Sequence, residues 1–140
     1  MKNLSKFMGV SYRRSQKFYT GRLKDLDITS GQYMYIIAIC ENAGKTQDDL
    51  SQEMLIDKGT AARVLFQLEM NGFLTKSMNP ADRREYNIFP TAKALAAYPE
   101  VLKVREEWHR KLTEDFSDIE REIFEKLFEK AMLNAIENCE

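Results

Sequence analysis

Six residues that follow Asp57 have the types and the spacing that suit contacts to the edges of DNA bases. On a helix that begins after Asp57, their face lies opposite the apolar stripe Ala61, Leu65 and Leu68. Arginine offers two parallel donors to guanine, glutamine pairs with adenine, threonine bonds a base edge or a phosphate, and alanine touches a thymine methyl group. The six residues are Lys58, Gly59, Thr60, Ala62, Arg63 and Gln67. Because a polar face on an isolated helix is usually just solvated, this prediction depends on the neighbouring elements.

A second basic group lies at the tip of a predicted hairpin. Residues 73–78 and 85–89 are short, extended-type runs, and the loop 79–84 between them is rich in turn-forming residues. Arg83 and Arg84 at this tip can enter a minor groove, where the negative potential attracts arginine. The sequence thus predicts two DNA-contacting elements close together in the chain.

The sequence lacks the motifs of an enzyme or of a metal site. His109 is the one histidine, and with Glu106 three residues before it the pair supplies too few ligands for a metal ion. Cys40 lies in an apolar run and is expected to be a small buried hydrophobe, while a redox role for Cys40 or Cys139 stays open. We therefore expect no catalysis, no metal and no cofactor.

Capping patterns and apolar periodicity predict the helices that position these groups. Apolar residues recur at helical spacing from Leu4 to Leu26, and a capping-box pattern at residues 29–32 precedes a buried helix that Gly44 ends. A second capping box at residues 46–49 begins a helix of two turns, and Asp57 caps the next, which ends near Gly72. These two helices form a helix-turn-helix pattern.

The C-terminal part of the chain is also predicted to be helical. Thr91 opens a helix that Pro99 is expected to kink or divide, and a capping box at residues 117–120 opens another. The expected fold is therefore mainly α with one hairpin, an α+β arrangement.

Length, composition and charge limit the class of protein further. The chain has 140 residues, enough for one compact unit or two small lobes, and its longest apolar run, residues 33–40, is too short to span a bilayer. A cytoplasmic protein that does not bind a membrane is expected. The net charge is +7 over residues 1–24 and −5 over residues 100–140, which favours pairing between the two ends of the chain.

The order and spacing of these motifs resemble the MarR family of winged helix-turn-helix transcription regulators. The resemblance is carried by residues 28–32, 50–54, 57–60 with Arg63, 68–74, and 79–84 with Thr91. It covers the chain from end to end. In the family's D-x-R pattern, which falls on Asp82 and Arg84, the arginine reaches the minor groove and the aspartate braces the wing.

The resemblance implies a single unit over residues 1–140, with a DNA-binding lobe at 29–91 and a dimerisation lobe made from 1–28 and 92–140. It also implies a homodimer that binds a pseudo-palindromic double-stranded operator, acts as a repressor, and is released by a small amphipathic or aromatic ligand. Candidates for the effector site, between the lobes and bordered by the first, second and fifth helices, are Tyr12, Arg13, Tyr33 and Tyr35, although core packing is an alternative role for each.

Three residues depart from the family pattern, and the first of them bears on sequence specificity. Ala62 replaces a common Thr or Ser and so removes a hydroxyl from the predicted DNA face, while Pro90 and Ala94 replace a common Leu and Gly. Neither cysteine matches the reactive N-terminal cysteine of the peroxide-sensing branch. Ala62 and the modest charge of residues 57–99, +2, leave open a second hypothesis, a winged-helix protein-interaction module without sequence-specific DNA binding.

Overall fold

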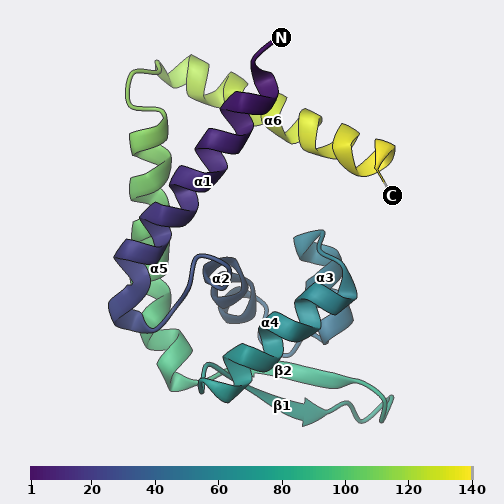
Figure 1. Cartoon of the computed structure of the whole chain (residues 1–140). Helices are drawn as coiled ribbons and strands as arrows, with labels where there is room; N and C mark the ends of the chain where they lie inside the picture. The colour runs from purple at the N-terminus through teal and green to yellow at the C-terminus, as the bar shows by residue number, and fades with distance from the viewer. Residues whose placement is uncertain (140) are drawn as a thin grey trace. The chain divides into compact units, whose positions relative to one another are not determined.

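The computed structural model describes residues 1–139, which form a mostly helical fold with a two-stranded antiparallel sheet (Figure 1). This confirms the predicted α-rich fold class. The chain separates into two compact units, Met1–Glu106 and Glu107–Glu140. The functional lobe boundaries expected at residues 29–91 stay a prediction. The elements are α1 (Leu4–Leu23), η1 (Lys24–Leu26), α2 (Tyr33–Glu41), α3 (Gln47–Met54), α4 (Lys58–Met70), β1 (Leu74–Met78), β2 (Tyr86–Pro90), α5 (Ala92–Leu112) and α6 (Asp118–Asn138).

The first helix is shorter than its apolar pattern predicts. It ends at Leu23, and one 3-10 turn follows before Asp27 takes a left-handed conformation with φ of 61°. Tyr19 and Leu23 near its C-terminus are buried, whereas Leu4 and Phe7 near its N-terminus are exposed. Only the C-terminal half of α1 is thus packed within its own unit.

The predicted capping box before α2 is only half formed. The Thr29 N–H donates to the Gln32 side chain at 3.1 Å, but residues 29–32 make a separate turn and α2 begins at Tyr33 without a side-chain cap. The helix does not need this cap, because its residues 35–39 are all buried and hydrophobic packing dominates helix stability in proteins. The predicted burial of α2 is confirmed.

The helix-turn-helix consists of α3 and α4, and both predicted caps are present. Thr46 and Asp49 form the complete capping box of α3, and the Asp57 carboxylate accepts from the Thr60 N–H at 2.9 Å. Between the two helices Leu55 is left-handed, with φ of 57°. The two helices pack against each other. Leu50 of α3 and Leu65 and Leu68 of α4 are buried, and burial of each stabilises the fold by about 1.5–3 kcal/mol.

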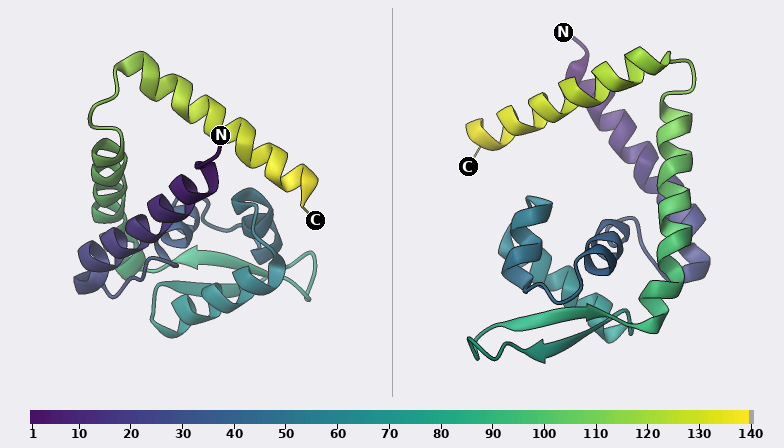
Figure 2. Two further views of the ribbon diagram at one scale, coloured as in Figure 1. Left: turned by 45° about the horizontal axis from the view of Figure 1, so that its top comes forward. Right: turned by 180° about the vertical axis from the view of Figure 1, so that it is seen from behind.

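The hairpin β1–β2 is tied to the helix-turn-helix through residues 44–46. Its register pairs Leu74 with Pro90 and Met78 with Tyr86, and it runs along one edge of the first unit (Figures 1 and 2). The Gly44 N–H donates to the Ile88 carbonyl at 2.8 Å. Gly44 has the positive φ expected of a helix-ending glycine, at 90°, but instead of capping α2 it begins this pairing with β2. The prediction of a glycine cap at this position was wrong in that respect.

In α5 the buried residues recur at helical spacing, and the helix passes through Pro99 without being divided. Thr91 accepts from the Ala94 N–H at 3.3 Å and so begins the helix as predicted. Pro99 is exposed, and it removes one backbone hydrogen bond from the helix. The buried residues of α5 are Ala94, Ala97, Val101 and Val104.

In the second unit, the predicted capping box of α6 is complete. The Ser117 hydroxyl accepts from the Glu120 N–H, and the Glu120 carboxylate accepts from the Ser117 N–H. Phe124 contacts Phe116 and Phe128 edge-on, with ring centroids 5.4 and 5.6 Å away. None of the residues Asp118–Asn138 is buried. Across residues 1–139, the structure contains no helix that is both long and apolar enough to cross a membrane.

Candidate nucleic-acid interface

The N-terminus of α4 is fixed by two hydrogen bonds between Asp57 and Thr60. The Thr60 N–H donates to one carboxylate oxygen at 2.9 Å, and the Thr60 hydroxyl donates to the other at 2.7 Å. These bonds lower the pKa of Asp57, so the carboxylate is ionised at neutral pH. Because the hydroxyl proton of Thr60 is used here, Thr60 has only acceptor lone pairs left for a contact with DNA.

The structure places the predicted polar residues on one accessible face of α4. Lys58, Gly59, Arg63 and Gln67 are exposed, and Thr60 and Ala62 are half-buried. The opposite stripe, Ala61, Leu65 and Leu68, is buried in the core of the first unit. The face therefore has the geometry that the sequence predicts, a polar surface held on a packed helix.

Lys58 pairs with Asp48 of α3, with 3.4 Å between Nζ and Oδ2. The Lys58 side chain is 70% exposed, so this pair contributes at most about 1 kcal/mol and leaves the ammonium group free to reorient. Lys58 can therefore contact a phosphate without disturbing the fold.

Tyr35 of α2 connects the core to this face. The residue is buried, and burial is the main reason why the pKa of its hydroxyl is raised. The Asp57 carboxylate raises this pKa further and the Arg63 guanidinium lowers it, which places both charges near the phenol. Tyr35, predicted as an effector candidate, is thus electrostatically coupled to two charged residues at the start of α4, Asp57 and Arg63.

At the hairpin tip, Asp82 braces Arg84 in the way that the family resemblance implies. One Asp82 carboxylate oxygen accepts from the Arg84 N–H at 3.0 Å and from Arg84 Nε at 3.3 Å. The Arg84 side chain is nevertheless 91% exposed, and Arg83 beside it is exposed as well. Asn79 accepts from the Ala81 N–H at 2.9 Å and stiffens the loop. The tip therefore presents two cations from an ordered turn.

The wing and the first turn of α3 border an open hollow of about 340 Å³. Basic and acidic side chains share its lining, which balances the charge within it. The lining residues are Thr46, Gln47, Asp48, Lys76, Arg84, Glu85, Tyr86 and Ile88. The hollow places the wing arginine and the start of α3 on one continuous surface.

One of the other effector candidates, Tyr33, belongs to a pair of stacked tyrosines. Tyr33 stacks on Tyr19 of α1 with ring centroids 3.9 Å apart and planes 11° apart. The Tyr19 hydroxyl is buried without a well-formed hydrogen bond, and burial, with a smaller contribution from Tyr33, raises the pKa of Tyr19 well above its usual range. Tyr12 influences the pKa of Tyr33 and so lies near it, but Tyr12 and Arg13 are exposed. The structure thus separates Tyr35 from the other three candidates.

Sequence reasoning did not single out Tyr19, Tyr98 or Arg105. The Tyr98 hydroxyl donates to the Glu41 carboxylate, and this hydrogen bond raises the pKa of Tyr98. The positive charge of Arg105 acts to lower the pKa of Tyr98 and of Tyr19. Tyr19 follows Tyr12 by seven residues, or about two helical turns, so the two lie on the same face of the helix. This spacing could have identified Tyr19 from the sequence. Burial, followed by the nearby Glu41 charge, raises the pKa of Cys40, which disfavours its thiolate. No group of three or more metal-ligating side chains occurs within residues 1–139.

Comparisons with known proteins agree with this geometry. The pattern of the MarR family matches residues 28–86. The HTH-type transcriptional regulator YybA of Bacillus subtilis (strain 168) is 31% identical over 134 residues, which cover 96% of this chain and 89% of that protein. A MarR family transcriptional regulator from Listeria monocytogenes, solved in complex with 26mer DNA, is similar with a TM-score of 0.89 and 28% identity, covering 99% of this chain and 92% of that chain. A MarR transcriptional regulator from Methanosarcina mazei Go1 has a TM-score of 0.86 and 28% identity, covering 98% of this chain and 99% of that chain.

Proposed function

The chain belongs to the MarR family of DNA-binding transcriptional regulators, and we propose that it works as a homodimeric repressor that a small amphipathic or aromatic ligand releases from DNA. The observation that carries this proposal is the face of α4, where a capped helix presents Arg63 and Gln67 to solvent above a fully packed stripe. A helix of this kind enters the major groove with its N-terminal residues at the base edges.

In this proposal the residues of α4 make two kinds of contact with DNA, to bases and to phosphates. Arg63 makes a bidentate contact with guanine, and Gln67 pairs with adenine. Lys58 and the backbone at Gly59 contact phosphates, because the N-terminus of a helix attracts anions. The solved complex of the Listeria monocytogenes regulator with 26mer DNA supports the use of this fold for DNA binding.

The wing contacts the neighbouring minor groove through Arg84, with Arg83 at the adjacent phosphates. The exposure of Arg84 and its brace by Asp82 support this role, since the side chain is free to extend while its backbone is held. A narrow minor groove concentrates negative potential and stabilises an inserted arginine.

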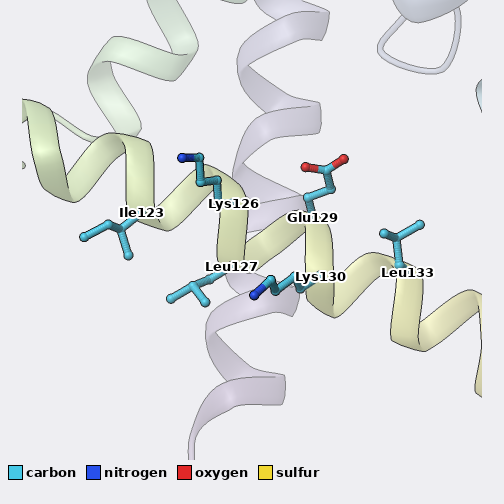
Figure 3. A pocket seen from close by; sticks show the side chains of 6 residues that line it. All are labelled: Ile123, Lys126, Leu127, Glu129, Lys130 and Leu133. Carbon is cyan, nitrogen blue, oxygen red and sulfur yellow. The ribbon is translucent and has the colours of Figure 1, made fainter.

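The exposed apolar face of α6 supports dimerisation. A helix of 21 residues with none of them buried leaves its large apolar side chains in water, which is unfavourable for a lone chain. Ile123 and Leu127 project from the same side of α6 and line a shallow groove with Leu133 (Figure 3). Their exposed fractions of 50% and 58% mark them as residues that a partner would cover.

A second copy of the chain is the partner that the charges favour. Residues 1–24 carry seven basic residues and no acidic ones, whereas residues 100–140 have a net charge of −5. Leu4 and Phe7 of α1 are also exposed, by 47% and 61%. Opposite charges would guide the ends of two protomers together, and the apolar side chains would supply most of the stabilisation.

Two recognition helices related by a two-fold axis fit a pseudo-palindromic operator. Successive major grooves on one side of B-DNA are about 34–36 Å apart, which sets the spacing of the half-sites. A dimer bound over a promoter excludes the polymerase by steric overlap, which is the repressor role that we propose.

The proposed effector site lies around Tyr12, Arg13 and Tyr33 in the first unit. A stacked aromatic pair offers a surface for a further ring, and the Arg13 guanidinium suits a carboxylate. In this proposal Tyr35, whose pKa the charge of Arg63 lowers, transmits the effect of a ligand on α2 to the DNA face.

The proposal is tested with the full chain and a pool of random duplexes. We expect selection to yield a two-fold symmetric site, and light scattering to give two chains for each duplex. Binding that is equal for all sequences, or that is absent, would favour the protein-interaction module. Benzoate is a suitable first probe of the effector site, with release of labelled duplex followed by anisotropy and an Arg13→Ala variant as the control.

A further inference from the structure

Phe66 is an exposed aromatic residue on the same side of α4 as the proposed base contacts. Its exposed fraction is 56%, although α4 buries three other residues, Ala61, Leu65 and Leu68, in the core. We propose that Phe66 contacts the methyl group of a thymine in the major groove and so contributes to the choice of operator. This inference rests on the proposed function, since it requires that α4 lies in the groove.

The helical register places Phe66 between two of the proposed contact residues. At 3.6 residues per turn, the direction of Phe66 around the helix axis is about 40° from that of Ala62. The direction of Arg63 is about 100° from that of Ala62, in the same sense, so Phe66 points between the two. It lies about one turn further along the helix than either. Both neighbours are on the accessible side, where Ala62 is half-buried and Arg63 exposed. A groove that Arg63 enters is therefore within reach of Phe66.

The chemistry of the pair Ala62 and Phe66 favours thymine. The C5-methyl of thymine is the apolar group that the major groove presents, and alanine and phenylalanine are among the side chains that contact it. Ala62 has no hydroxyl for a hydrogen bond and is small enough to let the helix backbone approach the bases. A phenyl ring one turn away can then displace water from a thymine methyl group. The same ring would gain nothing from contact with a phosphate, which is charged and hydrated.

The apolar surface continues along α4 to Met70, which is 70% exposed. Met70 lies near the C-terminal end of the helix, about one turn beyond Phe66 and about two turns beyond Arg63. We expect the helix to leave the groove before this point, because the N-terminal residues of a recognition helix make the base contacts. Met70 therefore provides a matched control, an exposed apolar residue on the same helix without a base contact.

The experiment combines side-chain truncation with removal of single thymine methyl groups. Each thymine of the selected operator is replaced in turn by uracil, at symmetric positions in both half-sites. Affinity is measured by anisotropy for the wild type, Phe66→Ala, Phe66→Gln and Met70→Ala. The thermal midpoint of each variant is recorded as well. Alanine and glutamine are both better helix formers than phenylalanine, and Phe66→Gln removes the ring while it keeps a longer side chain.

We expect the wild type to lose affinity at one symmetric pair of thymines, by about fourfold per half-site, which is the effect of burying one methyl group. Phe66→Ala and Phe66→Gln should bind the thymine and uracil operators equally at that pair, while Met70→Ala should behave as the wild type does. Uracil effects that are the same at every position with and without the Phe66 side chain, or that are absent throughout, would overturn the inference while leaving the proposed function intact. Failure of the wild type to select any operator would overturn both.

Discussion

Among single residues, Arg63 has the arrangement that best suits direct contact with a base. Its guanidinium is exposed, its helix is packed beneath it, and the buried Tyr35 lies close enough for the charge of Arg63 to lower the phenol pKa. The planar guanidinium presents two donors at a fixed spacing, which matches the two acceptors of guanine.

We predict that Arg63→Ala weakens binding to the selected operator by about 1–3 kcal/mol and flattens the sequence preference. Affinities for the operator and for a scrambled duplex would be measured under the same salt conditions. Lys103→Ala, which removes an exposed charge from α5, is the control and should leave both affinities unchanged. Equal losses on both duplexes would place Arg63 among the phosphate contacts instead.

Arg84 is predicted to make a different kind of contact. It would interact with the DNA backbone and respond to the width of the minor groove, not to the identity of a base. Loss of one phosphate contact should reduce the magnitude of the log–log salt slope by about 0.9 per subunit, or about 1.8 for a dimer. We expect Arg84→Ala to show this change and a weaker preference for A·T-rich flanks, with a nearly unchanged thermal midpoint because the side chain is exposed.

Asp82→Ala is the companion variant for the wing. It keeps the arginine but removes the carboxylate that accepts from the Arg84 N–H. Its effect on affinity should be smaller than that of Arg84→Ala. A wild-type salt slope in Arg84→Ala would contradict the minor-groove assignment.

The residues that sequence could identify are those whose role depends on a few neighbours in the chain. The Asp57 cap and the Asp82–Arg84 brace connect residues two or three positions apart, and both are present as predicted. The Tyr19–Tyr33 stack joins two helices, so no local pattern specifies it. Contact of the face of α4 with DNA stays a prediction.

At the scale of elements, the Asp57 cap connects pH to the recognition helix. Its pKa is lowered in the folded state by the two bonds from Thr60. A carboxylate with a lowered folded pKa stabilises the fold above its unfolded pKa, and this stabilisation is lost as the pH falls through the folded pKa.

We therefore predict that the thermal midpoint of the wild type falls as the pH drops below about 4, with part of the fall due to Asp57. Asp57→Asn retains a good capping residue that does not titrate in this range, so its midpoint should fall less between pH 7 and pH 3. Glu120 also has a lowered pKa and serves as a background contribution in both proteins. Identical pH profiles would show that the cap contributes no pH dependence.

Element boundaries were predictable where a cap decides them and less so where packing does. The capping boxes of α3 and α6 are complete, and both helices begin where the sequence indicates. The same pattern at Thr29 produces only a turn, because buried apolar residues determine where α2 starts. The sequence identified Gly44 as a position where the backbone turns. It did not identify the hydrogen-bond partner of Gly44 in β2, because that partner is distant in the sequence.

For the whole molecule, the main feature is that apolar side chains near both ends of the chain are exposed to solvent in a single protomer. We predict that deletion of residues 1–12, which removes Leu4 and Phe7, lowers stability and converts a dimer into monomer or aggregate. Light scattering and thermal unfolding of the purified chains would measure this. As a control, Ser11→Ala within the same segment should remain dimeric. A truncated chain that stays a well-folded dimer would contradict the proposed interface.

This whole-molecule property could be inferred from sequence only through charge and family resemblance. The opposite charges of the two ends indicate pairing, but not whether it occurs within a chain or between chains. The structure adds that the apolar residues of α6 are unburied, which composition alone does not show.

The pairing of residues 44–46 with β2 has a consequence for the order in which the protein folds. The bonds between Gly44, Lys45 and Ile88 close a loop of more than 40 residues, and α3 and α4 lie inside that loop. The entropy of closing it is lost before the bonds compensate, so the helices should form first and the paired edge last. In pulsed hydrogen exchange, the amides of Leu65 and Leu68 should therefore gain protection before those of Gly44 and Ile88. At equilibrium these four amides should open together.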